Sequence, residues 1–239
     1  MQSVIGHAAA EKSRAASVCV FHLNVKEPET MTTHTTSSDR PFKQKRRIWM
    51  LWALAAAFIV FHLIASPGFL LENLALTLFA QIGTLLVAFG VIGRVWSIIY
   101  VGGLKNSELV TEGPYSVTRN PLYLFSLFAI SGVCLVFGSL VATATFTLLA
   151  YLVFRYAAKR EALYLSHLFG ERYSEYARRT PFFWPDLSMF RWGQVHAISR
   201  DALLVTTRDA LFIFAMIPFS ELVEYLRESG FLPMAITVL

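Results

Sequence analysis

The sequence predicts an all-α protein, a polytopic membrane helix bundle of four or five spans with a polar helical segment in its C-terminal half. Composition is the first observation: of 239 residues, 55% are hydrophobic and 15% are charged, and the mean hydropathy is +0.52. Soluble domains carry about 25% charged residues, so this balance favours a membrane protein. The second observation is that the apolar residues gather in runs close to the roughly 20 residues that cross a bilayer.

The first two predicted spans lie in the N-terminal half. Residues 48–65 carry no charge and follow a basic cluster at 43–47, and a Ser-Pro-Gly turn ends the run at 66–68. The second run extends from about 74 to 101 and contains Arg94 near its end. A charge at mid-bilayer costs about 2.5–3.5 kcal/mol and usually faces a cavity or a partner. Arg94 is therefore predicted either to contact a substrate or to snorkel to the headgroups.

Two further runs, 122–137 and 140–158, are separated only by Gly138-Ser139, which predicts a tight helical hairpin. The first of them is short for an upright crossing, so it is expected to start below the headgroups, with the loop before it buried against protein. A polar, Tyr-rich stretch occupies 159–179. The last apolar run, 210–226, carries a proline and two glutamates and is predicted to be a fifth span or an interfacial helix.

We divide the chain into four parts. Residues 1–40 mix Ser, Thr, Ala and charges without periodicity and are interpreted as a disordered leader. The alternative is a translation-start artefact, because the stretch that begins at Met31 reads like an ordinary N-terminus before a first membrane helix. Residues 41–101 hold the first two membrane helices, 102–185 the functional core, and 186–239 a connector and a C-terminal membrane or interfacial helix.

Charge and cysteine usage exclude several classes of function. The net charge of +5 comes from Lys and Arg beside apolar runs, which is typical of cytoplasmic flanks and not of a nucleic-acid surface. The basic clusters at 43–47 and 159–160 fall on the same side as the loop 102–120, and the positive-inside bias makes that side cytoplasmic. Cys19 and Cys134 predict no disulfide, and the six histidines show no ligand spacing, so we predict no metal.

The loop reads GGLKNSELVTEGPYSVTRNPLYLF. Asn120 suits an N-cap and Pro121 a first helical residue, so a helix is predicted to begin there. The positive end of that helix favours an anion such as a ligand carboxylate, and Arg119 adds charge at the same point. The alternative is that Arg119 only snorkels and Asn120 only caps.

This stretch resembles the signature of the isoprenylcysteine carboxyl methyltransferase and phospholipid methyltransferase superfamily, in which Leu-Val-x-x-Gly-x-Tyr runs into Arg-His-Pro-x-Tyr or Arg-Asn-Pro-x-Tyr. The matching residues here are Leu109, Val110, Gly113, Tyr115, Arg119, Asn120, Pro121 and Tyr123. A second block of the family pattern, Glu-Glu-x-x-Leu-x-x-x-Phe-Gly with two later tyrosines and a proline stretch, is matched by Glu161, Leu165, Phe169, Gly170, Tyr173, Tyr176, Pro181 and Pro185.

The resemblance implies an integral membrane methyltransferase that uses S-adenosyl-L-methionine, bound between the membrane helices and a cytosolic C-terminal helical segment that completes the cofactor site. The contacts carried over are Ser107, Glu108, Leu109, Val110, Tyr115, Asn120, Pro121, Leu122, Tyr123 and Glu161. Arg119 and Glu161 are the candidates for catalytic roles. The tyrosine rings suit the positive sulfonium, and the carboxylate of Glu161 suits the cofactor's ammonium group or ribose hydroxyls.

Two departures from the family pattern bear on the substrate. Ala162 replaces the second acidic residue, and Ala157 stands where members acting on a prenylated cysteine carboxylate are expected to carry an arginine. Arg94, Arg155 and Arg160 are the candidates for substrate contacts.

The acceptor is expected to be lipid-like or isoprenoid, an amphiphile that reaches the site from the bilayer. Two alternatives stay open: an NADPH-dependent membrane reductase of the sterol-reductase type, and a non-catalytic membrane protein on the same scaffold.

Overall fold

The computed structural model describes residues 44–67, 73–103, 107–194, 198–231 and 236–238. The predicted leader, 1–40, lies outside the described residues.

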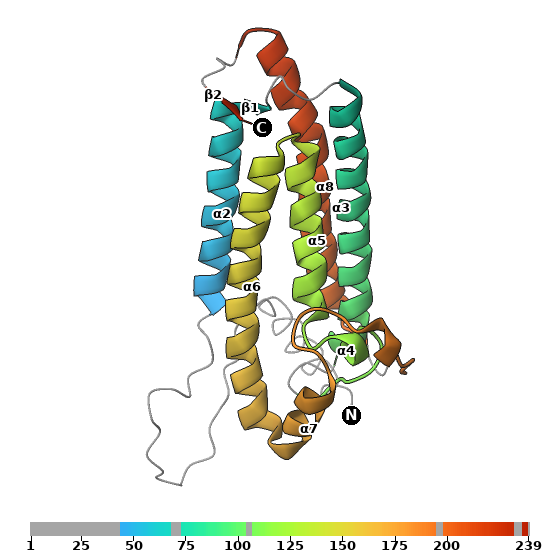
Figure 1. Cartoon of the computed structure of the whole chain (residues 1–239). Coiled ribbons are helices and arrows are strands. Elements are labelled where there is room, and N and C mark those ends of the chain that lie inside the picture. The colour runs from blue at the N-terminus through green and yellow to red at the C-terminus, as the bar shows by residue number, and fades with distance from the viewer. Residues whose placement is uncertain (1–43, 68–72, 104–106, 195–197, 232–235, 239) are drawn as a thin grey trace, which may run out of the picture.

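In the part of the chain that the structure describes, five long helices lie side by side and confirm the predicted all-α membrane bundle (Figure 1). They are α2 (Gln44–Ile64), α3 (Asn73–Val101), α5 (Pro121–Val136), α6 (Leu140–Phe169) and α8 (Arg200–Glu228). Three described helical segments are both long and apolar enough to cross a membrane, Leu76–Val101 in α3 and the whole of α6 and α8, whereas 48–64 and α5 are shorter apolar helices. The chain is therefore an integral membrane protein.

The short elements lie at the two ends of this bundle. The lower end in Figure 1 carries α4 (Pro114–Val117), α7 (Glu171–Arg179) and the 3₁₀ turn η2 (Leu187–Met189), and we call it the α7 end. At the opposite end, β1 (Ala65–Pro67) pairs in parallel with β2 (Ile236–Val238) and links the end of α2 to the C-terminal segment.

Two helices extend beyond the runs that predicted them. The apolar run predicted for α6 ends at residue 158, but the helix continues through the polar residues to Phe169. The extension is rich in Ala, Leu, Lys, Arg and Glu, which are strong helix formers, and the first breaker is Gly170. In the same way α8 begins at Arg200, capped by the Ser199 side chain, ten residues before the predicted run.

The hairpin between α5 and α6 forms as predicted. Gly138 takes a positive φ of 79°, which favours glycine, and Ser139 accepts a hydrogen bond from the Ala142 amide as the N-cap of α6. The hydroxyl of Thr147 then donates to Ser131 at 3.1 Å and links α6 back to α5.

Glycines bring α3 and α5 into backbone contact. A Cβ added at Gly83 would lie 2.7 Å from the carbonyl oxygen of Gly132, and one added at Gly132 would lie 2.5 Å from that of Gly83. A Cβ at Gly90 would lie 2.6 Å from the backbone nitrogen of Ala129. Small residues are what allows membrane helices to approach this closely. We call this contact of Gly83, Gly90 and Gly132 the glycine seam. It fixes α5 against α3, and the candidate site lies at the start of α5.

Candidate functional site

The predicted site residues gather at the α7 end of the bundle. The loop 107–113, the start of α5, the polar half of α6 and the connector that follows α7 all meet there (Figure 1).

The start of α5 falls where the sequence predicts it, but the cap differs. Pro121 is the first helical residue and Asn120 occupies the N-cap position. The prediction that the Asn120 side chain caps the helix is wrong, because its amide donates instead to the carbonyl oxygen of Phe182 at 2.7 Å. The connector brings this unpaired carbonyl within reach, and Asn120 satisfies it.

Two segments, 117–119 and 181–186, are hydrogen-bonded to each other just before the short helix α5. The Arg119 amide donates to the Pro181 carbonyl at 2.9 Å, and the Asp186 amide donates to the Val117 carbonyl at 3.0 Å. The Thr118 hydroxyl, which is almost fully buried, donates to the Phe183 carbonyl. These bonds satisfy backbone N–H and C=O groups that have no partner within a helix. Irregular backbone near the membrane needs such partners, because lipid offers none. The prediction that the loop before this span is buried against protein is confirmed.

A hydrogen bond joins the start of α5 to the polar half of α6. The hydroxyl of Tyr123, two residues after Pro121, donates to the carboxylate of Glu161 at 2.9 Å. The Tyr123 ring stacks on Phe154 of α6, with centroids 5.5 Å apart and an interplanar angle of 26°. The two blocks of the sequence pattern, 38 residues apart at these positions, are thus in direct contact.

Arg119, four residues before Tyr123 in the chain, lies in an aromatic environment. Its guanidinium carbon is 5.1 Å from the centre of the Phe182 ring, and its Nε is buried without a hydrogen-bond partner. Burial raises the pKa of the Tyr173 hydroxyl, while the charge of Arg119 and its hydrogen bond to that hydroxyl act in the opposite direction. Tyr173 is buried, as expected for a packing residue.

Tyr115 is held beneath α7 by a tyrosine pair. The hydroxyl of Tyr176 donates to the Tyr115 carbonyl at 2.8 Å, and both residues are buried. Burial raises the pKa of Tyr115 well above its usual 10.0, and the negative charge of nearby Glu161 raises it further. Tyr115 therefore remains a neutral hydroxyl at physiological pH.

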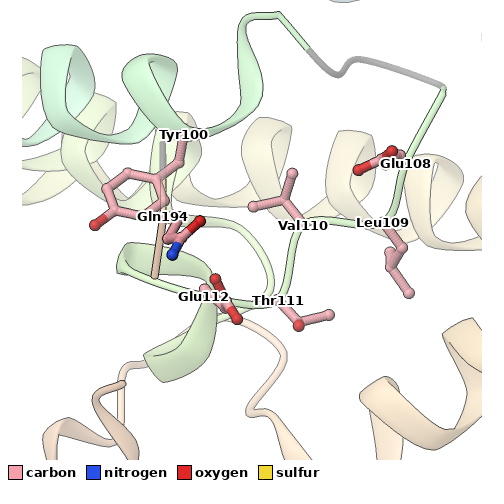
Figure 2. A pocket seen from close by; sticks show the side chains of 7 residues that line it. All are labelled: Tyr100, Glu108, Leu109, Val110, Thr111, Glu112 and Gln194. Atoms are coloured by element: carbon pink, nitrogen blue, oxygen red, sulfur yellow. The ribbon is translucent and has the colours of Figure 1, made fainter. Parts of the chain in front are cut away.

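The loop before α4 lines a separate, small pocket. It holds about 140 Å³ and is lined by Tyr100, Glu108, Leu109, Val110, Thr111, Glu112 and Gln194, as Figure 2 shows. Ligand sites commonly measure roughly 300–1,000 Å³, so this pocket accommodates only part of a cofactor-sized molecule. Tyr123 and Glu161 do not line it.

The predicted cofactor contacts thus fall into two neighbouring groups. Glu108, Leu109 and Val110 line the pocket, and Ser107 is exposed just before them. The second group surrounds the Tyr123–Glu161 hydrogen bond and consists of Tyr115, Asn120, Pro121, Leu122, Tyr123 and Glu161. Gly113 connects the groups and is fixed by its amide, which donates to the Arg191 carbonyl at 2.9 Å.

The three arginines predicted for the substrate lie in different places. Arg155 is exposed and donates to the Tyr151 hydroxyl at 3.2 Å on its own helix, and Arg160 is half-buried one residue before Glu161. Arg94 forms an ion pair with Asp209 of α8 at 3.3 Å.

The sequence analysis missed Asp209. A signal for it existed, because Asp209 directly precedes the run from which the last helix was predicted. Within the described ranges, no group of three or more His, Cys, Asp or Glu residues is arranged to hold a metal ion.

Comparison with known proteins gives one family and several relatives. The family described as Phospholipid methyltransferase matches residues 76–172. The "Cobalt-zinc-cadmium resistance protein CzcN" of Cupriavidus metallidurans is 31% identical over 201 residues, covering 82% of this chain and 90% of that protein. The "Nickel-cobalt-cadmium resistance protein NccN" of Alcaligenes xylosoxydans xylosoxydans is 30% identical over 183 residues, or 77% and 85%.

A shorter match connects the chain to a protein named as a methyltransferase. The "Protein-S-isoprenylcysteine O-methyltransferase" of Schizosaccharomyces pombe is 33% identical over 78 residues, which are 32% of this chain and 33% of that protein. No solved structure matches the chain significantly.

Proposed function

The chain belongs to the phospholipid methyltransferase and isoprenylcysteine carboxyl methyltransferase superfamily, and on this premise we propose that it is a membrane methyltransferase that uses S-adenosyl-L-methionine. The observation that carries the proposal is the hydrogen bond between Tyr123 and Glu161. It joins the start of α5 to the polar half of α6, and both residues lie within the stretch that the family matches.

The groups at the α7 end fit the chemistry of this cofactor. Its carboxylate needs a cationic or N–H partner. Arg119 offers both, because it is positively charged and its buried Nε has no hydrogen-bond partner within the protein. Its ammonium group or ribose hydroxyls need an acceptor, and the carboxylate of Glu161 is exposed and already oriented by Tyr123. The loop 107–110 and the first turn of α5 provide the remaining contacts.

The cofactor supplies an activated methyl group, and the protein residues supply position. Arg119 and Glu161 would hold the two charged ends, and the ring of Tyr115 or Tyr123 would stabilise the sulfonium charge. Holding donor and acceptor in line and away from water accounts for the rate enhancement. A carboxylate acceptor requires no general base.

The acceptor is an amphiphile that arrives from the bilayer, and the α7 end faces the cytoplasm. The exposed apolar side chains along α3, α6 and α8 support lateral access from lipid. The basic residues at the start of α2 and in α6 support the orientation, because positive residues favour the cytoplasmic side.

Ligand titration of the purified protein in lipid nanodiscs tests the proposal. We expect saturable binding of S-adenosylhomocysteine and none of NADPH by isothermal titration calorimetry. Glu161→Gln is expected to weaken that binding about 10- to 100-fold, since a hydrogen bond to a charged group contributes about 1.5–3 kcal/mol. Glu171→Gln, an exposed carboxylate on α7, is the matched control and should bind as the wild type does.

The other outcomes separate the alternatives. Binding of NADPH alone would favour a reductase, and binding of neither ligand would favour a non-catalytic scaffold. Unchanged affinity in Glu161→Gln would remove Glu161 from the site.

We propose further that the methyl transfer contributes to metal resistance. Two relatives, of which the chain covers 90% and 85%, are named as resistance proteins. A strain lacking the protein should grow more poorly in medium that contains cobalt, zinc, cadmium or nickel salts. The wild-type protein, but not Glu161→Gln, should restore growth. Restoration by Glu161→Gln would separate resistance from methyl transfer.

A further inference from the structure

An ion pair between α3 and α8 lies beside the first turns of α5. The Nη2 of Arg94 is 3.3 Å from the Oδ2 of Asp209, and its Nη1 donates to the Ser126 hydroxyl at 2.5 Å. A second guanidinium, that of Arg208, lies 3.7 Å from the other carboxylate oxygen. Three helices are therefore joined by a single charged network.

This network lies about two turns in from the end of α3, with Arg94 largely buried and Asp209 partly exposed on the face of α8. Arg94 is seven residues before the end of α3, which corresponds to about 10 Å along the helix. The Arg94 side chain is 22% exposed and that of Asp209 is 41% exposed. Charges at such depth are costly unless they are paired, so the pair holds α8 to α3 at one register.

The network continues into the candidate site. The Ser126 hydroxyl donates to the Leu122 carbonyl at 2.6 Å, so Arg94 is linked through one side chain to the first turn of α5. The next residue, Tyr123, is held from the other side by Glu161 and by its stack on Phe154. The start of α5 is thus held by hydrogen bonds to Arg94 of α3, which is paired with α8, and to Glu161 of α6.

We propose that Asp209 and Arg94 are positioning residues that set the rotation and depth of the first turn of α5, and through it the Tyr123–Glu161 pair. The role in cofactor binding rests on the proposed function. The structural coupling between the Arg94–Asp209 ion pair and the first turn of α5 does not. Asp209 lies outside the stretch 76–172 that the family matches, so α8 contributes to the site a residue that lies beyond this stretch.

Hydrogen exchange of the whole protein in nanodiscs tests the coupling without any ligand. Asp209→Asn keeps the shape of the side chain and removes its charge, and we expect severalfold faster exchange of the amides in 122–126. Asp209→Glu should restore protection, which a loss of packing alone would not predict. The matched control is Asp201→Asn, an exposed aspartate in the first turn of the same helix, and it should exchange as the wild type does.

A second variant covers the case in which Asp209→Asn fails to fold. Ser126→Ala leaves the ion pair intact and cuts only its link to α5, so exchange in 122–126 should again accelerate while 200–210 stays protected. Wild-type exchange rates in Ser126→Ala or in folded Asp209→Asn would overturn the inference.

Ligand affinity separates this inference from the proposed function. We expect Asp209→Asn to weaken S-adenosylhomocysteine binding about 3- to 10-fold. Wild-type protein that binds no S-adenosylhomocysteine would refute the proposed function and the cofactor part of the inference, while exchange would still decide the coupling. Wild-type binding together with unchanged affinity in Asp209→Asn would refute the positioning role alone.

Discussion

Tyr123 shows how one side chain joins distant parts of the chain. Its ring packs on Phe154 and its hydroxyl reaches the exposed carboxylate of Glu161. A tyrosine suits this place because it offers an apolar body and a polar tip. The residue thus stabilises the contact between α5 and α6 and orients the acidic group of the candidate site.

Tyr123→Phe isolates the role of this hydroxyl. The ring stack remains, so the unfolding temperature should change little. Affinity for S-adenosylhomocysteine should fall about 3- to 10-fold, because a net hydrogen bond contributes about 0.5–1.5 kcal/mol. Calorimetric titration measures the change, and equal affinity in the two proteins would show that Tyr123 does not orient Glu161.

The buried tyrosines at the α7 end predict a fall in stability at alkaline pH. Burial raises the pKa of Tyr115, Tyr173 and Tyr176 above the usual 10.0. The unfolded chain therefore loses these protons first, and the stabilisation, complete below about pH 10, is lost as the pH rises further. The unfolding temperature should drop more steeply above about pH 10 than below it.

Tyr176→Phe tests this assignment. The variant loses its bond to the Tyr115 carbonyl and starts from a lower unfolding temperature, but it has one ionisable hydroxyl fewer. Its decline above about pH 10 should be shallower than that of the wild type. Tyr225→Phe, at an exposed tyrosine of α8, is the control, and an equally steep decline in Tyr176→Phe would contradict the prediction.

At the scale of elements, the glycine seam and the long α6 decide what meets at the site. The seam draws α3 and α5 into backbone contact. The unbroken helix from Leu140 to Phe169 carries Glu161 past the apolar run and down to the start of α5.

Gly132→Leu is expected to disrupt the bundle. Its Cβ would already lie 2.5 Å from the Gly83 carbonyl oxygen, and a backbone oxygen has little room to yield. Over-packing of this kind costs about 1–3 kcal/mol or more. Thermal unfolding in detergent and size-exclusion chromatography should show a lower melting temperature and aggregation. Leu85→Phe, at an exposed position of α3, is the control, and a fully stable Gly132→Leu would show that the seam opens at little cost.

At the scale of the whole molecule, the two ends of the bundle differ in structure. The candidate site lies at the α7 end, whereas the opposite end holds the α5–α6 hairpin and the short β1–β2 pair (Figure 1). Such polarity suits a protein that takes a soluble cofactor from one compartment and a lipid from the bilayer.

Cysteine labelling in intact cells tests the orientation. In a Cys19→Ser background, where the described cysteine Cys134 is buried, Ser107→Cys marks the α7 end and Ser229→Cys marks the opposite end. We expect a membrane-impermeant maleimide to label Ser229→Cys directly and Ser107→Cys only after permeabilisation. The reverse pattern would place the site outside the cytoplasm.

Local signals in the sequence predicted the class of fold and most helix boundaries correctly. Apolar runs, the break at Gly138-Ser139 and the Asn-Pro start at Asn120-Pro121 are local signals, and local signals set where a helix begins and ends. The order of the two motif blocks also pointed to the right superfamily.

Which side chains meet depends on how the helices pack. Asn120 serves the Phe182 carbonyl instead of its own helix, and Arg94 pairs with Asp209, 115 residues away. Neither partner is fixed by sequence spacing, because each pairing depends on how helices distant in the chain pack and on which buried polar group lacks a partner. Periodicity describes the face of one helix, whereas a site is formed where several faces converge.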